Sequence, residues 1–263
     1  MFEARSIAVR YGRRTVLEGV SLDVAPGSLT ALVGCNGAGK TTLLRALCGD
    51  IPIAAGAVAL DRQDLHAIAP EILARRRAVL PQASRLAFPY TVYEVVRLGL
   101  IAAGAPRETE GARIAVALAA AGLEGFGPRL YQELSGGEQQ RVNLARVLCQ
   151  VPEAVGGEGP RYLFLDEATA GLDLRHQLAA LATARAFADA GGGVLAILHD
   201  LNLAAMFADR IAVVHDGRLA GIGPPGEVLN DALLHEVFGV PLQVGAVPQA
   251  AVPFVLPQTL ARK

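Results

Sequence analysis

The sequence predicts an α/β domain built around a parallel β-sheet. Three short apolar runs, at residues 28–33, 162–165 and 194–198, carry this prediction, and each is typical of a buried strand. The first run leads into a glycine-rich loop with a lysine, the second into two carboxylates, and the third into a histidine. Because ligands bind outside the carboxyl ends of parallel strands, we expect these three strand ends to lie at one site.

The size and composition of the chain allow one domain with at most a small appendage. Its 263 residues are 52% hydrophobic, enough for a sizeable core, and the formal charge of −1 gives no reason to expect a nucleic-acid partner. The three cysteines, Cys35, Cys48 and Cys149, show no metal-binding spacing and fit a reducing compartment. The longest apolar runs, such as 114–121, are too short to span a bilayer, so a membrane role would need a separate spanning partner.

Two alternating segments near the N-terminus, residues 6–9 and 20–24, predict strands, with turns at 11–12 and 25–27. Tyr11 lies in this early region. Its ring is placed either to stack on a nucleotide base or to lie exposed or half-buried at a sheet edge, and position alone leaves both interpretations open.

The loop after the first apolar run fits the phosphate-binding pattern G-x-x-x-x-G-K-[ST] and precedes a helix predicted at 42–47. Glycines let the backbone wrap around an anion because they accept positive φ, and the loop amides then face the phosphates. Lys40 can reach the β- and γ-phosphates, and the Thr41 hydroxyl can bind Mg²⁺. The alternative is a plain turn that caps a helix, which the strand, loop, lysine and threonine together disfavour. The predicted phosphate-binding residues are Gly34, Cys35, Asn36, Gly37, Ala38, Gly39, Lys40, Thr41 and Thr42.

The middle of the chain continues with predicted strands at 56–60 and 77–80, the second followed by Pro81-Gln82. Helices are predicted at 92–100 and 113–122, the latter with Gly122 as its C-terminal stop, and a glycine-rich loop at 154–160.

A second motif, Leu-Ser-Gly-Gly-Glu-Gln-Gln-Arg at residues 134–141, begins a helix. Ser135 at the N-cap and Glu138 three residues later form a capping box. An ordinary helix start is the alternative interpretation, but Gly136 and Gly137 weaken a helix and a cap does not need them. They favour an open helix N-terminus that holds a second anion.

Polar side chains follow the other two buried strands. Asp166 is suited to binding a metal ion, directly or through water, and Glu167 is suited to polarising an attacking water. The alternative is that both carboxylates simply lie in solvent at the end of the strand. His199 ends the strand at 194–198 and is either a structural histidine or a contact to the γ-phosphate, which its place at a strand end favours.

These motifs together resemble the ATP-binding cassette family, the nucleotide-binding subunits of ABC transporters, from Tyr11 to about Gly223. The resemblance implies a P-loop NTPase fold with a parallel-sheet core, an antiparallel β subdomain and a helical signature subdomain at about 85–150. It also implies a nucleotide-binding domain over residues 1–240, followed by a short tail at 241–263.

The resemblance further implies ATP and Mg²⁺ as ligands and a role for each matching residue. Tyr11 looks like the adenine-stacking aromatic, and Gln82 like the residue that senses Mg²⁺ and the membrane partner. Residues 134–139 look like the signature that closes on ATP held by the opposite subunit of a head-to-tail homodimer. Asp173 resembles the D-loop aspartate and His199 the switch histidine.

Finer resemblance, at residues 76–82, 88–92 and 173–177, indicates the importer branch that serves iron chelates and cobalamin, and within it the ATPases of haem import. It implies uptake of haem (hemin) through a separate transmembrane permease dimer, with a periplasmic haem-binding protein as an indirect partner. The subunit would lie at the cytoplasmic face of the bacterial inner membrane as a peripheral protein, and residues 83–100 would carry closure to the permease. An iron-siderophore or cobalamin importer is the alternative.

Two rival classes are weaker. Soluble cassette ATPases of DNA repair or translation usually carry two cassettes or large inserts, and this chain shows neither. Glu167 and His199 argue against a nucleotide-gated module without turnover. Three positions depart from the family pattern: Cys35 and Ala168 stand where proline is usual, and Gly171 where alanine is usual. Ala168 and Gly171 loosen the backbone around Glu167 and Asp173, which bears on the hydrolysis rate.

Overall fold

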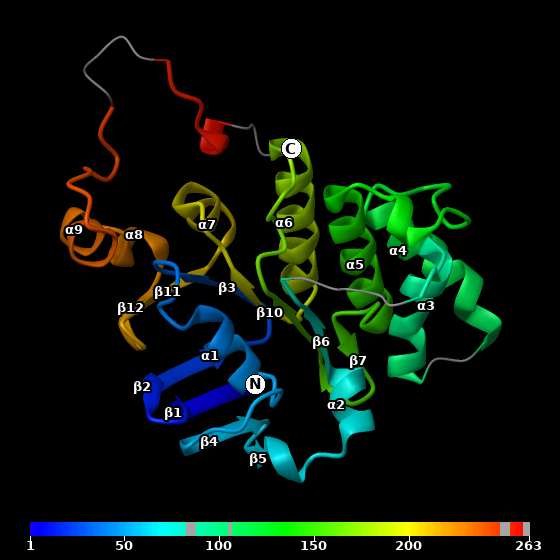
Figure 1. Cartoon of the computed structure of the whole chain (residues 1–263), viewed down its shortest axis with the longest axis horizontal. Coiled ribbons are helices and arrows are strands. Elements are labelled where there is room, and N and C mark those ends of the chain that lie inside the picture. The colour runs from blue at the N-terminus through cyan, green and yellow to red at the C-terminus, as the bar shows by residue number, and fades with distance from the viewer. Residues whose placement is uncertain (83–87, 105–106, 248–252, 260–263) are drawn as a thin grey trace.

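The computed structural model describes residues 1–82, 88–104, 107–247 and 253–259, and shows a four-stranded and a six-stranded β-sheet, a small two-stranded one, and helices packed on and beside them (Figure 1). The α-helices in these ranges are α1 Lys40–Leu47, α2 Pro70–Arg76, α3 Val92–Ala103, α4 Glu110–Ala120, α5 Gly136–Gln150, α6 Leu174–Asp189, α7 Leu201–Phe207, α8 Pro225–Val228 and α9 Asp231–Phe238. Short 3₁₀ turns are η1 Leu65–Ala67, η2 Arg107–Thr109, η3 Tyr131–Glu133 and η4 Pro257–Thr259. None of the helices in the described ranges is long and apolar enough to cross a membrane.

The first sheet is antiparallel and has the strand order β2-β1-β4-β5. Its strands are β1 Phe2–Tyr11, β2 Arg14–Val24, β4 Ala55–Leu60 and β5 Gln63–Asp64. β1 and β2 extend beyond the segments predicted at 6–9 and 20–24, because the two strands pair all the way from Phe2 with Val24 to Tyr11 with Arg14.

The second sheet has the order β12-β11-β3-β10-β9-β6, and its pairs are parallel except β11 with β12. Its strands are β3 Ser28–Val33, β6 Arg77–Leu80, β9 Tyr162–Leu165, β10 Gly193–Ile197, β11 Arg210–His215 and β12 Arg218–Gly223. Val194 of β10 pairs with Leu29 on one side and with Leu163 on the other. The carboxyl ends of β3, β10 and β9 therefore lie side by side, and the predicted parallel core is confirmed.

The strand β9 separates two hydrophobic cores. Tyr162 and Phe164 face the core shared with α1 and the antiparallel sheet, whereas Leu163 and Leu165 face the core beneath α5 and α6. All four side chains are buried. Burial on both faces fixes the strand whose end carries Asp166 and Glu167.

A third core joins α3, α4 and α5 into a helical subdomain, on the right of Figure 1. The helix α5 belongs to two cores, since Val142 and Ala145 pack in the helical core while Leu144 and Val147 pack against the parallel sheet. The motif at the start of α5 is therefore connected firmly to the sheet.

Three local predictions were imprecise or wrong. Residues 154–160 form a tight hairpin of β7 Val155–Gly156 and β8 Gly159–Pro160 rather than a loop, because two-residue strands show no periodicity in a sequence. The predicted helix at 92–100 continues to Ala103, where Gly104 with φ 64° ends it. The helix predicted at 113–122 begins earlier, at Glu110, and ends at Ala120, while Gly122 with φ 64° follows it as the predicted C-terminal stop.

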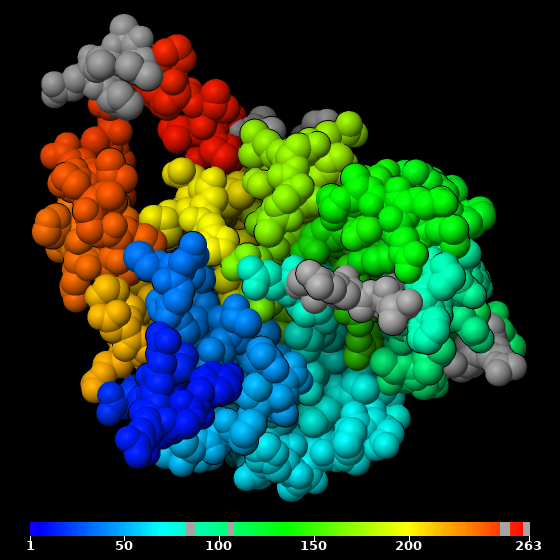
Figure 2. Space-filling view, in the orientation of Figure 1, coloured from blue at the N-terminus to red at the C-terminus, as the bar shows by residue number. Residues whose placement is uncertain are grey.

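The described C-terminal residues, 253–259, lie against helix α7. Figure 2 shows the red C-terminal segment lying against the yellow residues of that region. Gln258 in η4 donates to the backbone carbonyl and the side-chain oxygen of Asn202, each at 3.2 Å.

Candidate functional site

Two glycines permit the backbone path of the loop between β3 and α1. Gly34 has φ 144°, and a Cβ there would lie 2.1 Å from the Val214 carbonyl oxygen. Gly39 has φ 109° at the N-cap of α1, and a Cβ there would lie 2.8 Å from Cδ2 of Leu17. No side chain caps α1. Its first N–H groups are therefore left to an anionic ligand.

This loop lines a cavity of about 550 Å³ in which all three predicted strand ends meet. The lining residues are Val16, Asn36, Gly37, Gly39, Lys40, Thr41, Thr42, Gln82, Glu167 and His199. Gly34, Cys35 and Ala38 do not line it. Cys35 instead lies at the back of the loop, where its thiol donates to the carbonyl of Val237 at 3.0 Å.

Lys40 is almost fully buried within the loop between β3 and α1. Its ammonium donates to the carbonyls of Gly34 at 2.8 Å and Cys35 at 2.9 Å. Burial lowers the pKa of Lys40, and the nearby Glu167, Cys35 and Asp166 partly oppose that shift. A phosphate in the cavity would stabilise the charged form of Lys40 and offer an anionic acceptor in place of the neutral carbonyls.

Thr41 in the cavity wall is paired with Asp166, a buried carboxylate that does not itself line the cavity. The Thr41 hydroxyl donates to Oδ1 of Asp166 at 3.1 Å, and only 3% of Asp166 is exposed. Burial raises the pKa of Asp166, while its bond from Thr41 opposes the shift. Adjacent ligands of an octahedral Mg²⁺, each at about 2.1 Å, lie about 3 Å apart. The spacing and chemistry of this pair therefore fit that ion.

Glu167 lies at the centre of a hydrogen-bonded cluster. Its Oε2 accepts from Nε2 of Gln82 at 2.8 Å, and its Oε1 lies 2.8 Å from Nε2 of His199. Its backbone has φ 55°, in the left-handed region that non-glycine residues rarely occupy. Backbone strain of this kind concentrates at functional sites, where the surrounding structure maintains it. The parallel sheet brings Gln82, Glu167 and His199 together from three separate strand ends.

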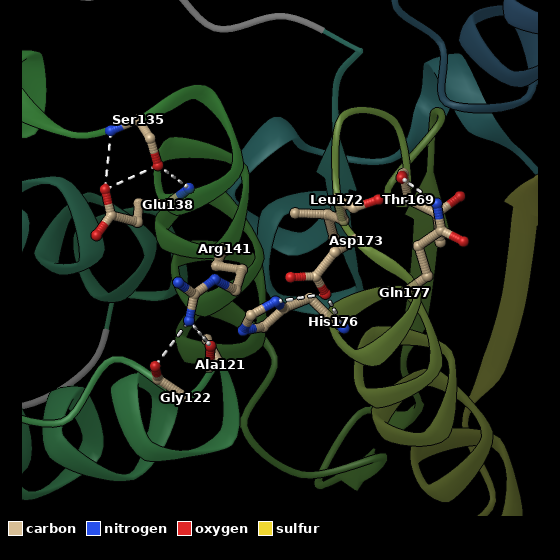
Figure 3. Close-up of polar contacts among 10 residues, drawn as sticks. All are labelled: Ala121, Gly122, Ser135, Glu138, Arg141, Thr169, Leu172, Asp173, His176 and Gln177. Atoms are coloured by element: carbon tan, nitrogen blue, oxygen red, sulfur yellow. Dashed lines mark hydrogen bonds and ion pairs between the residues drawn. The ribbon is translucent and has the colours of Figure 1, made fainter.

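The motif at the start of α5 lines a second, separate cavity of about 510 Å³ (Figure 3). The capping box is formed as predicted: Ser135 Oγ accepts from the Glu138 N–H at 3.3 Å, and the Ser135 N–H donates to Glu138 Oε2 at 2.8 Å. The lining residues are Ser135, Gly136, Gly137, Glu138, Arg141, Gly171, Leu172, Asp173 and His176. Within one chain, Ser135 and Asp173 thus share a cavity with each other and not with Lys40.

The structure also shows where Tyr11 lies and which cavity-lining residues the sequence did not predict. Tyr11 is 52% exposed at the end of β1 and lines neither cavity among the described residues. Sequence reasoning missed Val16, because an apolar residue in an edge strand carries no signal of its own. It also missed the roles of Arg141 and His176 as lining residues. Arg141 stands one helical turn beyond Glu138, a spacing that could have indicated the same face.

Comparisons with known proteins agree with this arrangement. A family model described as ABC transporter matches residues 17–170. The "Hemin import ATP-binding protein HmuV" of Rhizobium meliloti is 50% identical over 98% of this chain and 99% of its own length. The protein of the same name from Mesorhizobium japonicum is 52% identical over 98% of this chain and 99% of its own length. A solved "ATP binding subunit of ABC transporter" aligns over 94% of this chain and 95% of its own, with a TM-score of 0.77 and 26% identity. Sequence match, fold and the arrangement of strand ends lead to one conclusion: this chain belongs to the ABC transporter family.

Proposed function

We propose that the chain is the ATP-hydrolysing subunit of an importer that takes up hemin through a separate permease. The observation that carries the ATPase role is the Glu167 carboxylate, held at 2.8 Å from both Gln82 and His199 beside the phosphate-binding loop. The observation that supports hemin as cargo is the match to relatives named for hemin import, at about 50% identity over nearly the full chain.

In this proposal, ATP binds with its phosphates on the amides of the loop at 34–39 and beside Lys40. Thr41, Asp166 and Gln82 would hold Mg²⁺, which when bound would neutralise charge on the phosphate oxygens. Glu167 orients the attacking water and accepts its proton, and His199 keeps the carboxylate in place and faces the γ-phosphate. Catalysis is then mostly positioning and charge stabilisation.

Two copies would act together, head to tail. Lys40 and Ser135 line separate cavities of one chain. A second copy facing the first would bring its Ser135 and the open N-terminus of its α5 to the γ-phosphate. Tyr11, exposed at the rim of the antiparallel sheet, is proposed to stack on adenine, and Asp173 to contact the partner across the interface. ATP would favour the closed pair and hydrolysis would reset it.

The division of the chain also stays a proposal. We assign residues 1–240 to the nucleotide-binding domain, with the helical subdomain at about 85–150, and residues 241–263 to a tail. The packed core of α3, α4 and α5 supports the subdomain. Residues 83–87, the start of the segment proposed to dock on the permease, lie outside the described residues. Beside them, Phe88 is 65% exposed and in edge-to-face contact with Tyr90, at 6.4 Å between ring centroids.

A transport assay tests the cargo. Cells lacking the gene and dependent on hemin as their iron source should grow when given the chain, but not when given its Glu167→Gln variant. In this proposal the subunit binds its permease at the cytoplasmic face of the inner membrane, and a periplasmic haem-binding protein is an indirect partner. Restored growth on an iron-siderophore or on cobalamin, without growth on hemin, would refute hemin as cargo while leaving the ATPase role intact.

A further inference from the structure

The loop between β9 and α6, residues 166–173, carries both Glu167 and Asp173 but has little stiffness of its own. Glu167 has φ 55° and Gly171 has φ 71°, both in the left-handed region. Ala168 lacks the ring that proline would supply, and Gly171 has no side chain. A backbone in such conformations keeps its shape only where neighbouring groups hold it.

The first turn of α6 supplies two of those groups. The side-chain amide of Gln177 donates to the carbonyl of Leu172 at 2.9 Å and to that of Thr169 at 3.4 Å. On the opposite side of the helix start, Nδ1 of His176 lies 2.8 Å from Oδ1 of Asp173. Figure 3 shows Gln177 directed toward Thr169 and Leu172, and the His176 ring directed toward Asp173.

The loop also touches the helix that begins with the signature. A Cβ on Gly137 would lie 3.4 Å from the Gly171 carbonyl oxygen and 3.5 Å from Cδ2 of Leu172. From the same helix, the side-chain amide of Gln140 donates to the carbonyl of Glu167 at 3.4 Å. A shift of the loop would therefore move Glu167 in the first cavity and change the wall of the second.

We propose that Gln177 and His176 are positioning residues, which clamp this loop from α6 and so set Glu167 and Asp173 for ATP hydrolysis. Gln177 fixes the loop backbone by bonding two of its carbonyls. His176 fixes the Asp173 carboxylate, which also accepts the His176 N–H at 2.9 Å as the helix cap. The clamp replaces the stiffness that a proline at position 168 would give. This inference rests on the roles proposed above for Glu167 and Asp173.

Steady-state hydrolysis by the purified full-length chain tests Gln177. Gln177→Leu keeps the size of the side chain but removes its donor, and it should lower kcat about tenfold, within the range expected for a misplaced catalytic group. Affinity for a fluorescent ATP analogue should stay within about twofold, since Gln177 does not line the first cavity. Thr183→Ala is the matched control: it removes a side-chain bond to the Ala179 carbonyl within α6 and should leave kcat unchanged.

Rescue separates positioning from general destabilisation. Ala168→Pro restricts the loop covalently, at the position where the family usually has proline, and should restore kcat of Gln177→Leu at least threefold. The same substitution in the otherwise natural chain should change kcat less than twofold. A Gln177→Leu variant with natural kcat would overturn the proposal, as would a lowered kcat that Ala168→Pro leaves unchanged.

A second arm uses His176 and does not depend on whether Gln177→Leu folds. Asn places its amide nitrogen near the position of Nδ1, so His176→Asn should keep most of the activity, whereas His176→Leu should lower kcat at least threefold. Equal activity of the two variants would overturn the role of His176. If the Glu167→Gln variant hydrolyses ATP at the natural rate, the proposed ATPase function is refuted. If Glu167→Gln is inactive but Gln177→Leu and His176→Leu hydrolyse ATP at the natural rate, only the proposed positioning role of Gln177 and His176 is refuted.

Discussion

Replacing Glu167 by glutamine tests the proposed catalytic base with a minimal change in shape. Both neighbours of the carboxylate are placed to donate: Nε2 of Gln82 to Oε2 and Nε2 of His199 to Oε1, each at 2.8 Å. The glutamine retains one acceptor oxygen, and its amino group must face one of these two donors. It therefore loses one hydrogen bond of the cluster and cannot accept a proton from water.

The expected effect on turnover is large. Loss of a general base lowers rates by roughly 100- to 10,000-fold, which corresponds to about 3–5 kcal/mol in the activation free energy. Stability should change little, because the His199 side chain is 47% exposed and water can replace the lost partner. ATP binding should persist, since the loop amides and Lys40 are untouched.

Phosphate release measures kcat, and light scattering after size exclusion with ATP and Mg²⁺ measures assembly. The variant should accumulate as an ATP-bound dimer. Glu158→Gln is the matched control, because the Glu158 carboxylate also has a side-chain partner, Arg75 at 2.8 Å, but lies on the β7–β8 hairpin. It should keep natural turnover. A Glu167→Gln protein with kcat within tenfold of the natural chain would show that another group activates water.

Three further predictions concern other parts of the chain. Burial raises the pKa of Asp166, so the charge of its carboxylate opposes folding once the pH exceeds the ordinary pKa of an aspartate. Asp166→Asn should therefore abolish turnover yet raise the Tm of the nucleotide-free protein by about 2–4 °C. An unchanged or lower Tm at pH 7 would contradict this expectation. In intact-mass labelling, a maleimide should modify the partly exposed Cys35 first, because Cys48 and Cys149 are buried and burial raises the pKa of Cys149 to about 11. Equal labelling of the three cysteines would refute this order of reactivity. Phe88→Glu should abolish hemin uptake and leave basal ATP hydrolysis of the isolated subunit within twofold, since the exposed ring is proposed to dock on the permease; normal uptake would rule that surface out.

Local sequence determined the parts of the site that follow one another along the chain. The loop at 34–42, the capping box of Ser135 and Glu138, and the carboxylates after β9 each need only neighbouring residues to be recognised. Strands buried on both faces were also predictable, because residues 162–165 and 193–197 are apolar without alternation. Such patterns are short-range, and so is the physics behind them: backbone conformation, capping and side-chain burial.

Only the tertiary structure decided how these pieces meet. The bonds of Gln82 and His199 to Glu167 join residues 85 and 32 positions apart, and they follow from the order and register of strands β6, β9 and β10. The left-handed backbone of Glu167 has no sequence signal, since a glutamate adopts it only where packing enforces it. The pairing of strands distant in the sequence set this meeting of side chains, because the order β10-β9-β6 brings together residues that no single stretch of the sequence contains.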